Sequence, residues 1–104
     1  MNIVVLSGAI KWFRPKPTRD WPHAGFDLLI EGDSPGDFDP YRAVLCCMSN
    51  MPEALIDKLA QAPNGLRVKF WGTLCGIHGS DHWVEIATET FQILPGIVSL
   101  PIEK

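Results

Sequence analysis

A strict alternation of apolar and polar residues runs over residues 66–75 and predicts a β-strand. Alternate side chains of a strand point to opposite faces. The face expected to point inward carries Leu66, Val68, Phe70, Gly72 and Leu74. The face expected to point outward carries Arg67, Lys69, Trp71, Thr73 and Cys75. Glycine, serine and aspartate in residues 76–81 favour a hairpin loop. A returning strand is therefore expected over residues 82–94, before Pro95 and Gly96.

Three more strands are expected before this hairpin, because runs rich in valine, isoleucine and aromatic residues alternate with turn-forming residues. The first covers residues 2–13 and is interrupted by Gly8, where a missing side chain permits a bulge or sharp coiling. Three prolines make residues 14–24 an exposed loop. The second strand covers residues 25–31, and the third, almost continuously apolar, covers residues 41–48.

The periodicity changes to a helical one after residue 48. Ser49 or Asn50 is expected to cap a helix that continues to Gln61, and residues 63–65 stop it. Three strands, one helix and two strands form the plan of the OB-fold, a partly open barrel. We therefore predict an all-β fold: a five-stranded OB-fold barrel with one α-helix between strands 3 and 4. The domain is expected over residues 1–96, with a short C-terminal tail over residues 97–104.

Composition favours one globular domain, because 46% of the 104 residues are hydrophobic and 20% are charged. No apolar run has the length of a membrane crossing, so a soluble, cytoplasmic protein is expected.

Three cysteines make a poor secreted disulfide framework. Cys75, His78 and His82, with Cys47 across a sheet, are a weak zinc alternative to an ordinary turn. No catalytic or phosphate-cradling pattern occurs, and neither enzymatic activity, a metal nor a cofactor is expected.

Basic and aromatic residues gather in one segment, although the formal net charge is −3. Residues 11–21 hold four of the nine basic residues and three aromatic ones. Single-stranded nucleic acids bind to aromatic side chains that stack on bases and to cations that contact the backbone. The expected binding residues are Lys11, Trp12, Arg14, Lys16, Arg19 and Trp21 in this segment, Arg42 on the third strand, and Arg67, Lys69 and Trp71 on the fourth.

Several segments together resemble the single-stranded DNA-binding protein family, which includes the small primosomal replication protein N (PriB). They are residues 4–10 (VVLSGAI), 26–28 (FDL), 41–45 (YRAVL) and 65–74 (GLRVKFWGTL), with the helix between the last two. The resemblance covers roughly residues 2–94. It implies a homodimer or higher homo-oligomer that binds single-stranded DNA without strong sequence preference. Replication or recombination proteins are further implied partners, and a membrane is not.

Two features depart from this pattern. Residues 20–39 contain six acidic residues and no basic one, and Asp27 and Glu31 are expected to project where phosphates would lie. There is also no acidic tail of the kind that longer family members use to recruit partners. An alternative function is therefore a protein-interaction or oligomerisation module that has lost DNA binding, with Leu29, Val44, Cys46 and Trp71 at its interface.

Three further questions stay open in the sequence. Trp71 fits a base-stacking role and a subunit contact equally well. Trp12 and Phe13 have opposite parity, so one is expected in the core and the other at the surface. RNA remains an alternative ligand to DNA, because stacking reads the face of every base.

Overall fold

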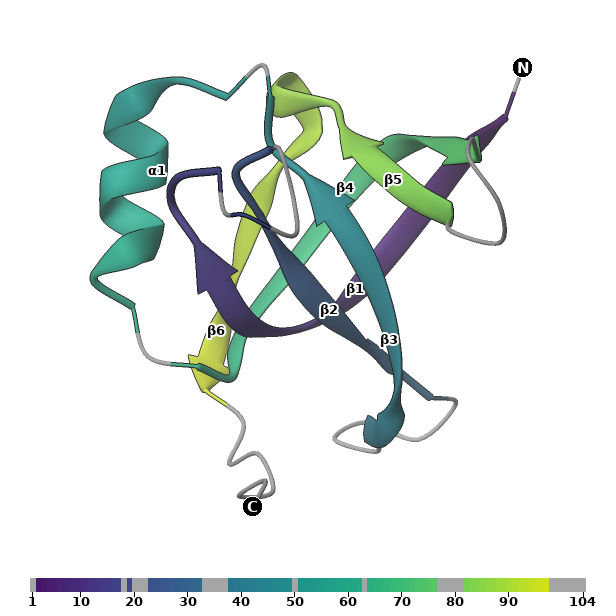
Figure 1. The fold of residues 1–104 in the computed structure, drawn as a ribbon. Helices are drawn as coiled ribbons and strands as arrows, with labels where there is room; N and C mark the ends of the chain where they lie inside the picture. The colour runs from purple at the N-terminus through teal and green to yellow at the C-terminus, as the bar shows by residue number, and fades with distance from the viewer. Residues whose placement is uncertain are drawn as a thin grey trace.

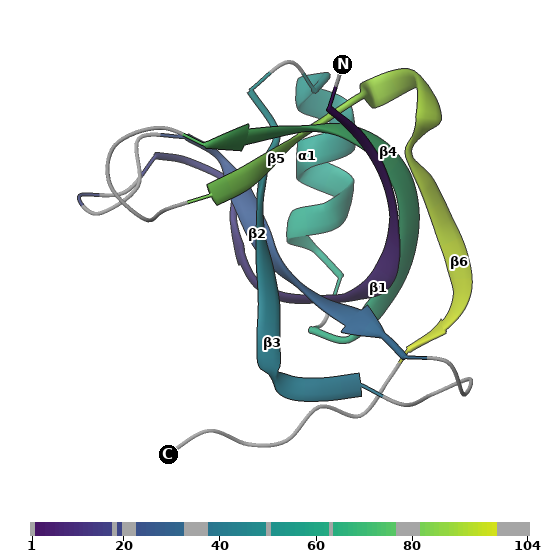
Figure 2. The same ribbon diagram turned by 90° about the vertical axis from the view of Figure 1, so that its right-hand side faces the viewer.

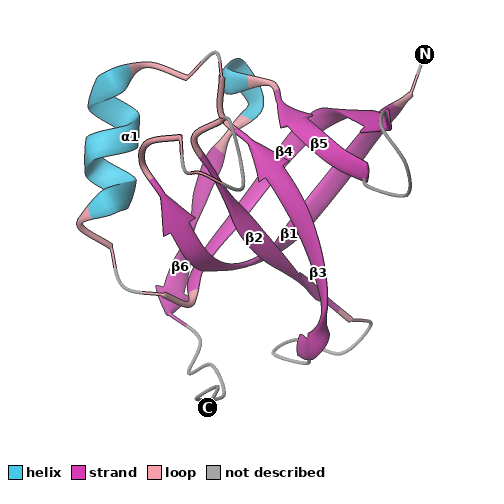
Figure 3. Cartoon of the chain, viewed as in Figure 1, coloured by secondary structure: helices cyan, strands magenta, loops and turns pink. Residues whose placement is uncertain are grey.

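The computed structural model describes residues 2–17, 19, 23–32, 38–49, 51–62, 64–76 and 82–97, and for residues 38–42 and 82 it describes the backbone alone. Most of the described chain is strand (Figures 1 and 3). The elements are, in order, β1 (Ile3–Arg14), β2 (Gly25–Glu31), β3 (Phe38–Cys47), α1 (Glu53–Ala60), β4 (Leu66–Gly76), β5 (His82–Ile86), the 3₁₀ helix η1 (Thr88–Thr90) and β6 (Gln92–Ile97).

Five of the strands close into a barrel. The first strand, β1, pairs antiparallel with β2 on one edge and with β4 on the other. The ring is completed by the antiparallel pairs β2–β3 and β4–β5 and by the parallel pair β3–β5. Figure 2 shows this ring with α1 behind it, at one end of the barrel. The strand β6 lies outside the ring, beside β4. The predicted fold class is confirmed: a closed, mixed five-stranded barrel with one helix between β3 and β4, consistent with an OB-like fold.

Barrel closure depends on a short stretch of β1 that pairs on both edges. Gly8 and Ala9 lie opposite Ile30 and Leu29 on β2 and, at the same time, opposite Val68 and Arg67 on β4. A Cβ atom on Gly8 would overlap the carbonyl oxygen of Leu29. Glycine at this position therefore lets β1 approach β2 closely at the point where β1 is also paired with β4.

Four phenylalanine rings run through the core in a chain. Phe13 stacks on Phe26 with ring centroids 6.5 Å apart, and Phe26 meets Phe70 edge to face at 6.1 Å. Phe70 in turn stacks on Phe91 at 5.9 Å.

Cys46 is also fully buried in the core, and burial raises the pKa of its thiol well above the usual range, with Asp27 as a second cause. The thiol is therefore kept in its neutral form within the apolar interior.

The helix α1 begins differently from the sequence-based expectation. Pro52 takes the capping position, and no side chain caps the helix. The Pro52 carbonyl oxygen accepts hydrogen bonds from the amides of Leu55 and Ile56, at 3.0 and 3.1 Å, so the first turn closes without a cap. The cap predicted at Ser49 or Asn50 is therefore wrong; Ser49 donates instead to Glu85 Oε1 at 3.3 Å, and Asn50 lies outside the described residues.

The single strand predicted over residues 82–94 is wrong. The chain breaks at η1 because Thr90 Oγ1 donates to the Ala87 carbonyl oxygen at 2.8 Å and accepts from the Trp71 amide at 2.9 Å. Phe91 then packs into the core, and β6 pairs with the first half of β4. The strand β6 also continues to Ile97, one residue past the expected domain limit, and residues 98–104 lie outside the described residues.

Two smaller observations complete the fold. The third strand begins at Phe38 rather than at Tyr41. Within the described part of the chain, none of the helices has both the length and the apolar character needed to cross a membrane.

Candidate nucleic-acid interface

A β-bulge near the end of β1 determines which of two neighbouring aromatic rings faces the surface. Lys11 lies opposite Asp27 and Arg14 lies opposite Gly25, so β1 places two residues where β2 places only Phe26. Phe13 turns inward onto Phe26, whereas Trp12 is 51% exposed. The opposite parity expected for these two rings is confirmed, and Trp12 is the outer one.

Trp12 adopts a backbone conformation that favours glycine. Its φ is +52°, the one positive value at a residue other than glycine in the described chain. The left-handed region costs an L-residue about 1 to 2 kcal/mol, which the surrounding contacts must offset. One of these contacts comes from Lys11, whose Nζ lies 4.3 Å from the centroid of the indole ring. Lys11 itself is only 7% exposed, so its ammonium group is held beside the ring rather than in solvent.

Arg14 is engaged within the protein. Its Nη2 donates to Asp27 Oδ1 at 2.9 Å, and its Nη1 donates to the Trp12 carbonyl oxygen at 3.2 Å. Both charged side chains are about a fifth exposed, at 21% and 18%. The buried Nε of Arg14 has no hydrogen-bond partner among the described residues. The guanidinium group therefore links β2 to the peptide that follows the strained Trp12.

Arg67 is engaged in a similar way on the other side of β1. Its Nη2 donates to both carboxylate oxygens of Glu31, at 3.2 and 3.0 Å, and its Nη1 contacts the Pro95 carbonyl oxygen at 3.5 Å. Ala9 lies between the two strands that carry this pair, because it is opposite Arg67 on β4 and Leu29 on β2. The ion pair therefore bridges β4 and β2 across β1.

These two ion pairs change how the acidic residues of β2 are interpreted. From the sequence, Asp27 and Glu31 were expected to repel phosphates, but each carboxylate is matched by an arginine. Of the four basic residues in residues 11–19, Arg14 is paired with Asp27 and Lys11 is buried. Lys16 and Arg19 are exposed there. Among the described residues, the positive charge that is exposed just after β1 therefore comes from Lys16 and Arg19.

Lys69 and Trp71 lie on a different part of the surface. Trp71 is 52% exposed and is opposite Val5 on β1, which is 54% exposed; Ile3, at 52%, lies opposite the neighbouring Thr73. Val5 is seven residues before Trp12, roughly 20 Å along the strand. The structure therefore separates the expected site residues into two groups: one at the end of β1, and one on the outer face of β4.

Two of the expected binding residues have no described side chain. Trp21 lies outside the described residues. Arg42 belongs to β3, but only its backbone is described. Of the zinc alternative, His78 and the side chain of His82 also lie outside, and no group of metal-ligating side chains comes together in the part of the chain that is described.

The interface expected for the alternative function is corrected by burial. Leu29 and Cys46 are fully buried, so neither contributes to a surface. Leu29 was expected on the outer face of β2, but its side chain is enclosed. The exposed apolar residues next to Trp71 are instead Ile3 and Val5. Their alternation with Val4 and Leu6 was a signal for this face that sequence reasoning missed.

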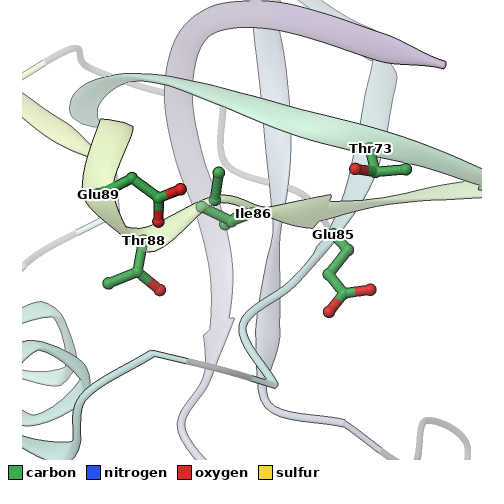
Figure 4. Close-up of a pocket in the computed structure, with 6 residues that line it drawn as sticks. Thr73, Glu85, Ile86, Thr88 and Glu89 are labelled. Atoms are coloured by element: carbon green, nitrogen blue, oxygen red, sulfur yellow. The ribbon is translucent and has the colours of Figure 1, made fainter. Parts of the chain in front are cut away.

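A depression of about 360 Å³ lies on the outside of β5 and η1, where Figure 4 shows Glu85 and Glu89 on either side of Ile86. Its other lining residues are Thr73, Ala87 and Thr88. Two carboxylates would repel phosphate groups, whereas nucleic-acid affinity comes mainly from cations. This depression is therefore a poor place for the nucleic-acid backbone.

Comparison with known proteins adds no family assignment: no protein-family model matches the chain, and no curated protein matches it. The fold and the two surfaces described above are therefore the basis for a functional proposal.

Proposed function

We propose that this protein binds single-stranded DNA at the end of β1, by stacking a base on Trp12 and contacting phosphates with Lys16 and Arg19. The observation that carries the proposal is the half-exposed indole of Trp12, held at a bulge by a strained backbone. Strain of this kind tends to persist at functional sites, where the surrounding structure enforces it. The proposed function is binding alone, without a catalytic step.

Three further features support this function. OB-fold barrels bind nucleic acids along β2 and β3 and through flanking loops, including the loop after β1, where Lys16 and Arg19 lie. Lys11 sits against the indole and adds positive charge next to a stacked base. The sequence also resembles the single-stranded DNA-binding protein family. Arg14 and Arg67 have a different part in this proposal, because their donors are directed to Asp27 and Glu31.

Binding of a labelled thymidine homo-oligonucleotide, followed by fluorescence anisotropy, tests the proposal. Affinity is expected to fall about sevenfold between roughly 50 and 200 mM salt, because two cation–phosphate contacts release counterions. Trp12→Gly is expected to weaken binding about fivefold or more, since base stacking on an aromatic ring contributes roughly 1 to 3 kcal/mol. Glycine adopts the positive φ readily, so this variant keeps the backbone conformation.

The matched control is Trp71→Ala, because Trp71 is as exposed as Trp12 but lies on the other surface. Its affinity for the oligonucleotide is expected to equal that of the unchanged protein. No anisotropy change at low salt, or equal losses in the two variants, would contradict the proposal. Much tighter binding of a uridine homo-oligonucleotide of the same length would identify RNA as the ligand instead.

A second candidate function, self-association, is favoured by the outer face of β1 and β4. Ile3, Val5 and Trp71 are each more than half exposed, and Val5 and Trp71 lie directly opposite each other. Clustered apolar side chains on a surface are typical of protein contacts, and tryptophan is enriched among the residues that dominate them. The occupant proposed for this face is a second copy of the chain.

Sedimentation velocity over a range of concentrations tests self-association. Trp71→Ala is expected to raise the dimer dissociation constant about thirtyfold, the equivalent of a loss of about 2 kcal/mol at a dominant contact. Ile97→Ala, which removes an exposed apolar side chain from β6, is expected to leave the dimer unchanged. A protein that sediments as a monomer at every concentration would refute this candidate.

A further inference from the structure

Asp27 lies on β2 opposite Lys11, next to the residues that we propose for an anionic ligand, and its effect on that ligand has two opposite interpretations. In one, it competes with phosphates for Arg14. In the other, it holds Arg14 in place for a structural purpose. The contacts of the arginine distinguish the two.

The Arg14 guanidinium group is shared between two acceptors. Nη2 donates to Asp27 Oδ1 at 2.9 Å, while Nη1 donates to the Trp12 carbonyl oxygen at 3.2 Å. The latter oxygen belongs to the one described residue other than glycine with a positive φ. Because the same rigid fork touches both acceptors, Asp27 fixes the peptide that follows Trp12 through Arg14.

Burial supports the structural reading. The Arg14 side chain is 21% exposed, and its Nε is buried with no partner in the described part of the chain. An unsatisfied buried donor costs free energy, so the guanidinium group is retained in this orientation at the expense of one hydrogen bond. An arginine that binds phosphate would instead present its fork to solvent.

The register of the strands ties a second contact to the same place. Lys11 lies directly opposite Asp27, and its Nζ is 4.3 Å from the centroid of the Trp12 ring. The backbone of Trp12 is thus fixed from one side by Arg14, and its ring is contacted by the residue that pairs with Asp27.

We infer that Asp27 is a positioning residue for the indole of Trp12: acting through Arg14, it stabilises the left-handed backbone conformation that presents the ring to a base. This inference rests on the proposed function, in which Trp12 is the stacking surface. Asp27 does not touch the ligand. Its contribution is to keep Trp12 in the binding orientation before the ligand arrives, which lowers the ordering cost of association.

Asp27→Asn separates the two readings, because they predict opposite signs. The substitution removes a negative charge, so a competing carboxylate would give tighter oligonucleotide binding. A positioning carboxylate gives weaker binding, by about threefold to tenfold, the cost of ordering one large side chain and its peptide. The matched control is Glu31→Gln, which removes the same charge from the same strand but breaks the ion pair with Arg67 instead. Its affinity is expected to be unchanged or slightly higher.

A double-variant cycle tests whether Asp27 acts through Arg14. Arg14→Ala and Asp27→Asn are each expected to weaken binding. The combined variant is expected to be no weaker than Arg14→Ala alone, because both substitutions act on the same ion pair, which one of them weakens and the other removes. Additive losses would overturn the claim that the carboxylate acts through the arginine. Arg14→Lys is expected to bind as weakly as Arg14→Ala. A single ammonium group does not reach both Asp27 Oδ1 and the Trp12 carbonyl oxygen, as the two-pronged guanidinium group does.

A readout without nucleic acid distinguishes a failure of this inference from a failure of the proposed function. The indole N–H signal of Trp12 in a ¹H–¹⁵N spectrum, assigned by its disappearance in Trp12→Gly, is expected to move in Asp27→Asn and to stay in place in Glu31→Gln. An unmoved Trp12 signal in Asp27→Asn would refute the positioning role even where the protein binds DNA. If the signal moves but the protein binds no oligonucleotide, the link from Asp27 through Arg14 to Trp12 is supported and the proposed function is refuted.

Discussion

Gly8→Ala is expected to remove about 3 kcal/mol or more of the free energy of unfolding. The added methyl group would overlap the Leu29 carbonyl oxygen, which belongs to the backbone of the neighbouring strand. Overpacking of this kind costs about 1 to 3 kcal/mol when side chains can adjust, and here no flexible group is available to move. The strand β1 cannot simply move away from β2 to remove this overlap, because Gly8 is also paired with Val68 on β4.

Urea unfolding followed by circular dichroism measures this loss, with Gly96→Ala as the control. Gly96 has a φ of +96° and open space around its Cβ position. Alanine there is expected to cost about 1 kcal/mol, from backbone strain alone. Equal losses in the two variants would mean that the close approach of the strands at Gly8 is unimportant for stability.

Phe70→Ala is expected to have an effect of similar size, about 3 to 5 kcal/mol. Phe70 is fully buried and joins two parts of the aromatic chain, because it contacts Phe26 on β2 and Phe91 after η1. Its removal leaves a cavity that the closed ring of strands cannot collapse to fill. The loss is therefore expected from both the lost transfer free energy and the remaining void.

The control for this variant is the preceding outward position of the same strand. Lys69 is exposed, and Lys69→Ala is expected to change stability by no more than about 0.5 kcal/mol. The dependence of unfolding free energy on urea is expected to have the same slope in both variants, which shows that the same surface unfolds. A small loss in Phe70→Ala would contradict the assignment of this ring to the centre of the core.

Much of this fold could be predicted from the sequence because its strands alternate cleanly. The alternation over β4 put Val68 and Phe70 inside and Lys69 outside, as the structure has them. The break at η1 could not be predicted, since threonine favours strands. The turn forms because Thr90 bonds to Trp71, a contact with a distant segment that local propensity does not contain.

The candidate site could be predicted in composition but not in arrangement. Parity separated Trp12 from Phe13, but only the bulge, which depends on pairing with β2, decides which ring is outside. Asp27 was interpreted as a repelling charge because the sequence does not show that Arg14 reaches it. Alternation put Trp71 on the outward face of the fourth strand, but only the pairing of β1 with β4 shows that it lies opposite the exposed Val5.

The pairing of β1 with β4 also has a consequence for the time at which the chain can fold. The partner of Val5 is Trp71, so the first strand has no complete set of neighbours until the fourth has been synthesised. At about 5 to 20 residues per second, the ribosome takes several seconds to cover that interval. Folding that requires such distant contacts is slow, on the millisecond to second scale. During synthesis the first strand therefore stays without its β4 partner for that interval, and the barrel closes only after β4 and β5 have been synthesised.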